Sequence, residues 1–177
     1  MTNKQNDRKG LVQVYTGSGK GKTTAALGLA LRASGHGLKV VVIQFLKSCQ
    51  QSGECQIIDQ YPIFRLLHPN TEDHFLQATS QLEATSGQAL TLAQNIIASG
   101  EADMVVLDEV FHSLHKRFIS LEEVQGLIAN KPKRMELILT GRNAPAEIIR
   151  MADLVTEMLA IKHPLAQGIP ARQGIEF

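Results

Sequence analysis

Short apolar runs alternate with longer amphipathic segments along this chain of 177 residues. Runs rich in Val, Ile and Leu predict strands at 11–16, 39–46, 104–109 and 135–140, with weaker candidates at 63–68 and 154–159. Apolar residues spaced three or four apart predict helices at 23–34, 81–99, 120–130 and 145–152. Strands and helices in this order predict an α/β fold, with a mostly parallel central sheet and helices on both of its faces.

Local signals mark several boundaries of these elements. Ser120 and Glu123 have the spacing of a capping box, and Pro145 suits the first turn of a helix. The segments 47–60 and 162–177 have the character of loops. The length and composition predict a single domain over 1–177, with 1–10 flexible.

Composition narrows the classes of function. With 44% hydrophobic residues, 20% charged residues and a net charge of +1, the overall charge favours neither nucleic acid nor a membrane surface as a partner. Apolar runs stay shorter than the ~20 residues that span a bilayer, and the polar N-terminus does not resemble a signal peptide. We therefore expect a cytoplasmic protein. Cys49 and Cys55 fit neither a CxxC pair nor a zinc site and are interpreted as free thiols.

A glycine-rich turn joins the first predicted strand to the first predicted helix. Such a turn directs backbone N–H groups and the positive end of the helix dipole at an anion. Lys22 can reach the terminal phosphates of a nucleotide, and the Thr23 hydroxyl can bind magnesium. The turn predicts a P-loop of RecA-like type that binds the phosphates of a nucleotide, although the usual pattern has glycine where this chain has Thr16. The residues expected to hold the phosphates here are Gly17, Gly19, Gly21, Lys22 and Thr23.

Charged residues after two later strands complete the predicted nucleotide site. Asp108 and Glu109 end a buried strand, so either carboxylate is a candidate ligand of the magnesium ion bound by Thr23. Arg142 follows another strand and is a candidate contact for a phosphate oxygen, while its spacing fits an ordinary surface arginine equally well. These residues predict a site for a nucleoside triphosphate with magnesium, and leave the reaction open.

With these motifs the chain resembles the corrinoid adenosyltransferases of the cobalamin pathway, the cob(I)yrinic acid a,c-diamide adenosyltransferase family. The resemblance covers nearly the whole chain and rests on residues 14–40, 42–48, 103–110, 139–158 and 161–177. A P-loop with threonine at its first position and an additional Gly-Lys pair, Gly19 and Lys20, is a mark of that family.

The resemblance implies transfer of the 5′-deoxyadenosyl group of ATP to a reduced corrinoid, either cobalamin or cobyrinic acid a,c-diamide, with release of triphosphate. It implies Lys22 and Glu109 as catalytic residues, Glu109 with Thr23 as metal partners, and Arg32 near the nucleoside. It implies that residues 17–24, which include Ser18, Lys20 and Thr24, hold the phosphates of ATP. It also implies a flavoprotein that reduces the cobalt, and a homodimer.

The sequence departs from the family in one segment. Some members place an aromatic segment before the long helix, where it helps to displace the lower axial ligand of cobalt. The corresponding residues here are 64–79, and the chain contains no tryptophan. Phe75 or His74 is a hypothetical replacement, and a surface loop with a partly buried Phe75 fits equally well. Two other functions remain open: an ATP-hydrolysing switch, with Glu109 orienting water, and a binder of ATP or corrinoid without catalysis.

Overall fold

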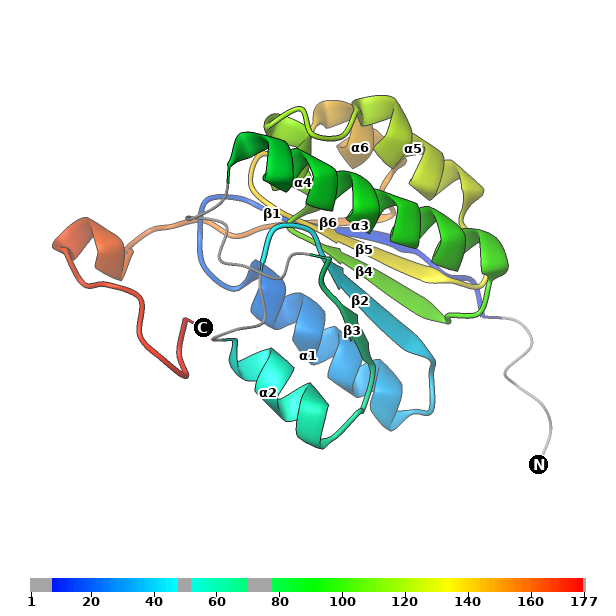
Figure 1. The fold of residues 1–177 in the computed structure, drawn as a ribbon, viewed down its shortest axis with the longest axis horizontal. Coiled ribbons are helices and arrows are strands. Elements are labelled where there is room, and N and C mark those ends of the chain that lie inside the picture. Colours follow the sequence, from blue (N-terminus) through cyan, green and yellow to red (C-terminus); the bar gives the residue numbers. More distant parts are fainter. Residues whose placement is uncertain (1–7, 48–51, 70–77, 177) are drawn as a thin grey trace.

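The core of the protein is one parallel sheet. The computed structural model describes residues 8–47, 52–69 and 78–176. Within them, six strands pair in the order β3-β2-β4-β5-β1-β6, and all five pairings are parallel (Figure 1). The strands are β1 (Val12–Thr16), β2 (Val40–Gln44), β3 (Arg65–Leu67), β4 (Met104–Asp108), β5 (Glu136–Thr140) and β6 (Leu154–Glu157).

Helices cover both faces of this sheet, as the alternation of apolar runs and amphipathic segments predicts. Helices α3 (Thr79–Ser99), α4 (Val110–His115), α5 (Leu121–Asn130) and α6 (Ala146–Met151) lie on one side. Helices α1 (Lys22–Gly35) and α2 (Gly53–Gln60) lie on the other (Figure 1). Alternate residues of β4 enter different cores: Val105 and Leu107 pack in the α3 layer, whereas Met104 and Val106 pack under α1.

The structure differs from the predicted elements in four places. Helix α2 occupies most of the predicted loop 47–60, and it was missed because Cys55 is its only buried residue. The short α4 and a 3-10 turn at Pro164–Gln167 are also additional. Pro145 is the N-cap of α6 and precedes its first residue, so its predicted place in the first turn is one position off.

The prediction of free thiols is wrong for Cys55, which is disulfide-bonded. Cys49 lies outside the described residues.

The parallel arrangement brings the carboxyl ends of the strands to one edge of the sheet. The loop after β1, the end of β2, Asp108 on β4 and Thr140 on β5 therefore become neighbours although they are far apart in sequence. Ligands of open parallel sheets bind at this edge.

None of the helices in the described part of the chain combines the length and the apolar character that a membrane span needs.

Candidate active site

The loop between β1 and α1 has the backbone geometry of an anion site. Gly17 and Gly21 have φ values of 97° and 115°, a region that favours glycine because it lacks a side chain. Gly21 is the N-cap of α1, and no side chain caps this end of the helix. The first amides of a 14-residue helix thus face the loop with the positive end of the helix dipole.

The other side of this loop is packed against the chain that follows β6. The Gly19 N–H donates to the Met158 carbonyl at 2.7 Å. A Cβ atom at Gly17 would lie 2.4 Å from the Met158 oxygen, and one at Gly19 would lie 2.8 Å from backbone atoms of Met158 and Leu159. The glycines are therefore required by close backbone packing. The Gly19 N–H is thus engaged by Met158 in this structure, and its contact with phosphate stays a prediction.

Lys22 and Arg142 are close enough to influence each other. The Lys22 ammonium donates to the carbonyls of Gly17 at 2.8 Å and Gly19 at 2.6 Å. Burial and the nearby Arg142 charge lower the pKa of Lys22.

Thr16 connects the loop to the segment after β5. The Ala144 N–H donates to the Thr16 hydroxyl at 3.0 Å. Threonine at the first loop position thus has a structural role. Arg142 is exposed, its charge acts on Lys22, and its contact with a phosphate oxygen stays a prediction.

Asp108 is the carboxylate that meets Thr23. Its side chain is 1% exposed, and its Oδ1 atom accepts from the Thr23 hydroxyl at 2.9 Å and from the Thr140 hydroxyl at 2.7 Å. Oxygen ligands from a carboxylate and a hydroxyl suit magnesium. Of the two acids left open by the sequence, Asp108 is therefore the one that hydrogen-bonds to Thr23.

Glu109 occupies a strained position beside this pair. Its φ of 60° lies in the left-handed region, which is uncommon for residues other than glycine, and it forms the N-cap of α4. Its N–H donates to the Thr140 hydroxyl at 2.9 Å, which holds the backbone at the end of β4. Its charge partly opposes the lowering of the Lys22 pKa and contributes to the raised pKa of Lys47, so the Glu109 side chain belongs electrostatically to the site. Its role as a metal partner stays a prediction.

The remaining predicted nucleotide residues lie in different surroundings. Ser18, Lys20 and Thr24 are exposed on the loop and the start of α1. Arg32 lies in the last turn of α1, about 15 Å along the helix from Lys22 at a rise of about 1.5 Å per residue. The structure does not bring Arg32 to the phosphate end of the site. His74 and Phe75 lie outside the described residues.

Lys20 joins the loop to the end of the chain. Its ammonium donates to the Glu176 carboxylate at 2.8 Å and to the Ile175 carbonyl at 3.0 Å. Arg172 also donates to Glu176, at 3.0 Å from its guanidinium. A residue predicted to bind phosphate thus already has an anionic partner, supplied by the tail shown in red in Figure 1.

This tail contact is expected to persist at neutral pH and to be lost only in acid. Hydrogen bonds from Arg172 and then Lys20 lower the pKa of Glu176 to about 2 from an ordinary value of 4.5. A carboxylate with a lowered pKa stabilises the folded arrangement above its unfolded pKa and loses this contribution as the pH falls through its folded pKa. NMR shifts of residues 172–176 should therefore stay constant from about pH 8 to about pH 5 and change below about pH 4. Glu176→Gln should abolish this acid step, and an unchanged step would contradict the contact.

Four residues of the site were not predicted as site residues: Gln44, Lys47, Glu54 and Thr140. Lys47 approaches Asp108 at 3.4 Å, and the Gln44 amide donates to Glu54 at 3.3 Å. Gln44 and Thr140 are each the last residue of a buried strand. A polar residue ending an apolar run is a signal available from sequence, because such a side chain lies at the ligand-binding edge of a parallel sheet.

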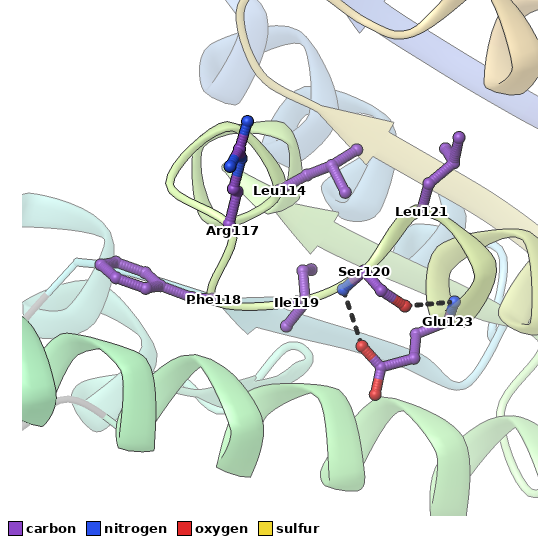
Figure 2. Close-up of a pocket in the computed structure, with 7 residues that line it drawn as sticks. All are labelled: Leu114, Arg117, Phe118, Ile119, Ser120, Leu121 and Glu123. Carbon is purple, nitrogen blue, oxygen red and sulfur yellow. Dashed lines mark hydrogen bonds between the residues drawn. The ribbon is translucent and has the colours of Figure 1, made fainter.

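A separate hollow of about 540 Å³ lies at the connection between α4 and α5 (Figure 2). None of its lining residues is a predicted site residue. Ser120 and Glu123 line it and form the predicted capping box: the Ser120 N–H donates to the Glu123 carboxylate at 2.7 Å, and the Glu123 N–H donates to the Ser120 hydroxyl at 3.2 Å. The polar groups of Ser120 and Glu123 therefore serve the start of α5.

The fold and this edge of the sheet define a P-loop nucleotide-binding protein. The flagellar accessory protein FlaH from Methanocaldococcus jannaschii has a similar fold, with a TM-score of 0.57 over 85% of this chain and 71% of FlaH. Sequence identity with FlaH is 9%, so this likeness concerns the fold alone.

Comparison of sequences gives the particular family. Residues 8–177 match the family ATP:corrinoid adenosyltransferase BtuR/CobO/CobP. A corrinoid adenosyltransferase from Sinorhizobium sp is 38% identical over 177 residues, which are 97% of this chain and 82% of the relative. The corrinoid adenosyltransferase of Escherichia coli K12 is 34% identical over 97% of this chain and 87% of its own length. CobA of Salmonella typhimurium, also a corrinoid adenosyltransferase, shows the same identity and coverage.

This chain belongs to the ATP:corrinoid adenosyltransferase family, as the resemblance of its motifs predicts. It is a transferase whose substrates are ATP and a corrinoid.

Proposed function

We propose that the chain transfers the 5′-deoxyadenosyl group of ATP to cobalt(I) of a corrinoid such as cobalamin or cobyrinic acid a,c-diamide, in the synthesis or salvage of adenosylcobalamin. The electron pair of cobalt attacks C5′, the cobalt–carbon bond forms, and the C5′–O bond breaks. Triphosphate leaves with the electrons of that bond, and cobalt becomes formally trivalent. The match to the family over residues 8–177, joined to the loop geometry, carries this proposal.

The residues around the loop suit a reaction in which charge develops on the leaving group. Cobalt(I) is already a strong nucleophile, so the protein needs no general base. It has to align C5′ with cobalt and stabilise the departing triphosphate. The amides at the start of α1, Lys22 and Arg142 place positive charge on one side of this edge, which supports their assignment as contacts of the triphosphate.

Magnesium is proposed to bind with the triphosphate. Thr23 and Asp108 present oxygen atoms 2.9 Å apart at the start of α1, and Glu109 follows Asp108 in the chain. This donor set fits a small hard cation, which would add positive charge beside the leaving group. In this arrangement Thr140 and Gln44 orient the Asp108 carboxylate, because both donate hydrogen bonds to it.

Two partners are part of the proposal. Cobalt must be reduced before the transfer, which calls for an electron donor, and we assign this step to a flavoprotein in the cytoplasm. A homodimer is also proposed. The edge strand β6 and the chain after it expose Leu154, Val155, Leu159 and Ile161, which supports a protein partner at that edge. Sedimentation at several concentrations would test the dimer.

The reaction is tested by mixing the protein with ATP, magnesium and chemically reduced cobalamin. We expect a light-sensitive cobalt–carbon bond, seen in the corrinoid absorption spectrum, together with one triphosphate per adenosyl group transferred. ADP and orthophosphate would indicate hydrolysis, and tight binding without turnover would indicate a binder. Failure with both cobalamin and cobyrinic acid a,c-diamide would refute the proposal.

A further inference from the structure

Lys47 places a partly buried cation beside the two residues assigned to magnesium. Its ammonium donates to the Thr23 hydroxyl at 3.3 Å and lies 3.4 Å from Oδ2 of Asp108. Oε1 of Glu54, on α2, lies 3.8 Å away. The Lys47 side chain is 29% exposed, and it follows β2 by three residues. The ammonium therefore lies among oxygen atoms supplied by α1, α2 and β4.

The surroundings explain why this cation is needed. Asp108 is 1% exposed, and a buried carboxylate is costly unless a cation or several hydrogen bonds compensate its charge. Gln44, itself fully buried, donates from its amide to Glu54 at 3.3 Å and to Asp108 at 3.5 Å. The amide thus bridges the two acids that the Lys47 ammonium faces.

Electrostatics keep Lys47 charged. Burial alone would lower its pKa, but the nearby carboxylates of Asp108, Glu109 and Glu54 outweigh burial and raise it. One further feature points to an additional ligand: among the described residues, the carbonyl oxygen of the buried Gln44 amide finds no hydrogen-bond partner, although it belongs to the same cluster. Such an oxygen is an acceptor for a water molecule of a hydrated cation.

A divalent ion and the ammonium compete for the same oxygens. Magnesium binds oxygen at about 2.0–2.1 Å and demands nearly octahedral geometry, so an ion on Thr23 and Asp108 would lie within a few ångströms of the present Lys47 ammonium. Two cations at this separation in a partly buried site repel each other strongly. Glu54, with Oε1 at 3.8 Å from the ammonium, offers it an alternative partner.

We propose that Lys47 is the resident counter-cation of the metal site. Without ATP, the ammonium compensates the charge of Asp108. When a divalent cation enters with ATP, the ammonium moves away from Thr23 and Asp108 and remains paired with Glu54. Lys47 is in this sense a positioning residue, which sets how strongly ATP binding depends on the metal. The inference rests on the proposed function only in assigning ATP and its metal to this site.

The test compares Lys47→Met with Lys39→Met, an exposed lysine just before the other end of β2. Calorimetry would give the Kd of ATP in EDTA and in excess magnesium. The Kd in EDTA divided by the Kd in magnesium measures how strongly ATP binding depends on the metal. Without the ammonium, the acidic cluster repels metal-free ATP and attracts magnesium more strongly. We expect the ratio to rise about tenfold or more in Lys47→Met and to stay at the wild-type value in Lys39→Met.

A second variant reverses the expected sign. In Glu54→Gln the ammonium has lost its alternative partner and should hold Asp108 more firmly, so metal dependence should fall below the wild-type value. Thermal unfolding without ATP gives an independent measurement: Lys47→Met should melt at a lower temperature than wild type in EDTA and recover with magnesium. Lys47→Arg, which keeps the charge, should restore much of the wild-type ratio.

The outcomes separate this inference from the proposed function. A ratio for Lys47→Met within about twofold of wild type, or a ratio for Glu54→Gln that does not fall, would overturn the role of Lys47. If Lys47→Met does not fold in either condition, the Glu54→Gln result decides. Loss of adenosyl transfer by wild-type protein that still binds ATP in a metal-dependent way would refute the proposed function and leave this inference standing.

Discussion

Lys22→Ala is expected to lower kcat/KM for adenosyl transfer by about a hundredfold or more. Removing one preorganised donor from a developing negative charge costs about this much in other enzymes, because the stabilisation is largest in the transition state. In this structure the Lys22 ammonium is held by the Gly17 and Gly19 carbonyls, beside the amides that start α1. Rotation of the Lys22 side chain would direct its ammonium from these carbonyls to a bound triphosphate.

Steady-state kinetics with ATP and reduced cobalamin would measure this effect. Lys39→Ala is the matched control, since Lys39 is an exposed lysine away from the loop and its loss should leave the rate unchanged. Circular dichroism would establish that Lys22→Ala keeps the fold. Normal turnover by the folded variant would show that the triphosphate does not lie where we place it.

Gly17→Ala is expected to destabilise the protein by about 2–4 kcal/mol and to weaken ATP binding as well. The new methyl group would lie 2.4 Å from the Met158 carbonyl oxygen, and the φ of 97° is unfavourable for alanine. Since the contacting atom is backbone, relief requires movement of the loop or of the chain after β6. For a chain of this length the melting temperature should fall by roughly 5–15 °C.

Gly28→Ala is a matched control in the middle of α1. No atom lies within 4 Å of the added Cβ there, and alanine favours a helix over glycine by about 1 kcal/mol. Gly28→Ala should therefore raise the melting temperature slightly. Equal melting temperatures for Gly17→Ala and wild type would mean that the chain after β6 does not pack against the loop as described.

Much of this fold was predictable because local sequence determines it. Each buried strand is a run of apolar residues long enough to stand out, and the family of the protein follows from motifs that lie in the loops after these strands. Helix α2 was not predictable in the same way. It has eight residues, of which Cys55 is the buried one, and glutamate, glutamine and aspartate interrupt its few apolar residues, so no long apolar pattern marks it.

The site was predictable where a motif fixes the backbone, and less so where contacts come from distant segments. The loop glycines and Thr23 belong to one continuous pattern, whereas Lys47, Glu54 and Met158 reach the site through tertiary packing. Spacing along the chain does not tell which exposed-looking lysine will face a buried acid. Spacing along the chain also does not distinguish Asp108 from Glu109 as the partner of Thr23. The pairing of β4 with β2 and β5 positions Asp108 so that its carboxylate meets the Thr23 hydroxyl.

The contacts of Lys20 with Ile175 and Glu176 also matter for handling the protein. They bring residues 175 and 176 to the glycine-rich loop proposed to hold ATP. A peptide tag inserted directly beside these two residues is therefore expected to disturb nucleotide affinity more than the same tag placed before Arg8. Binding measurements are best made on protein in which residues 172–176 are unaltered.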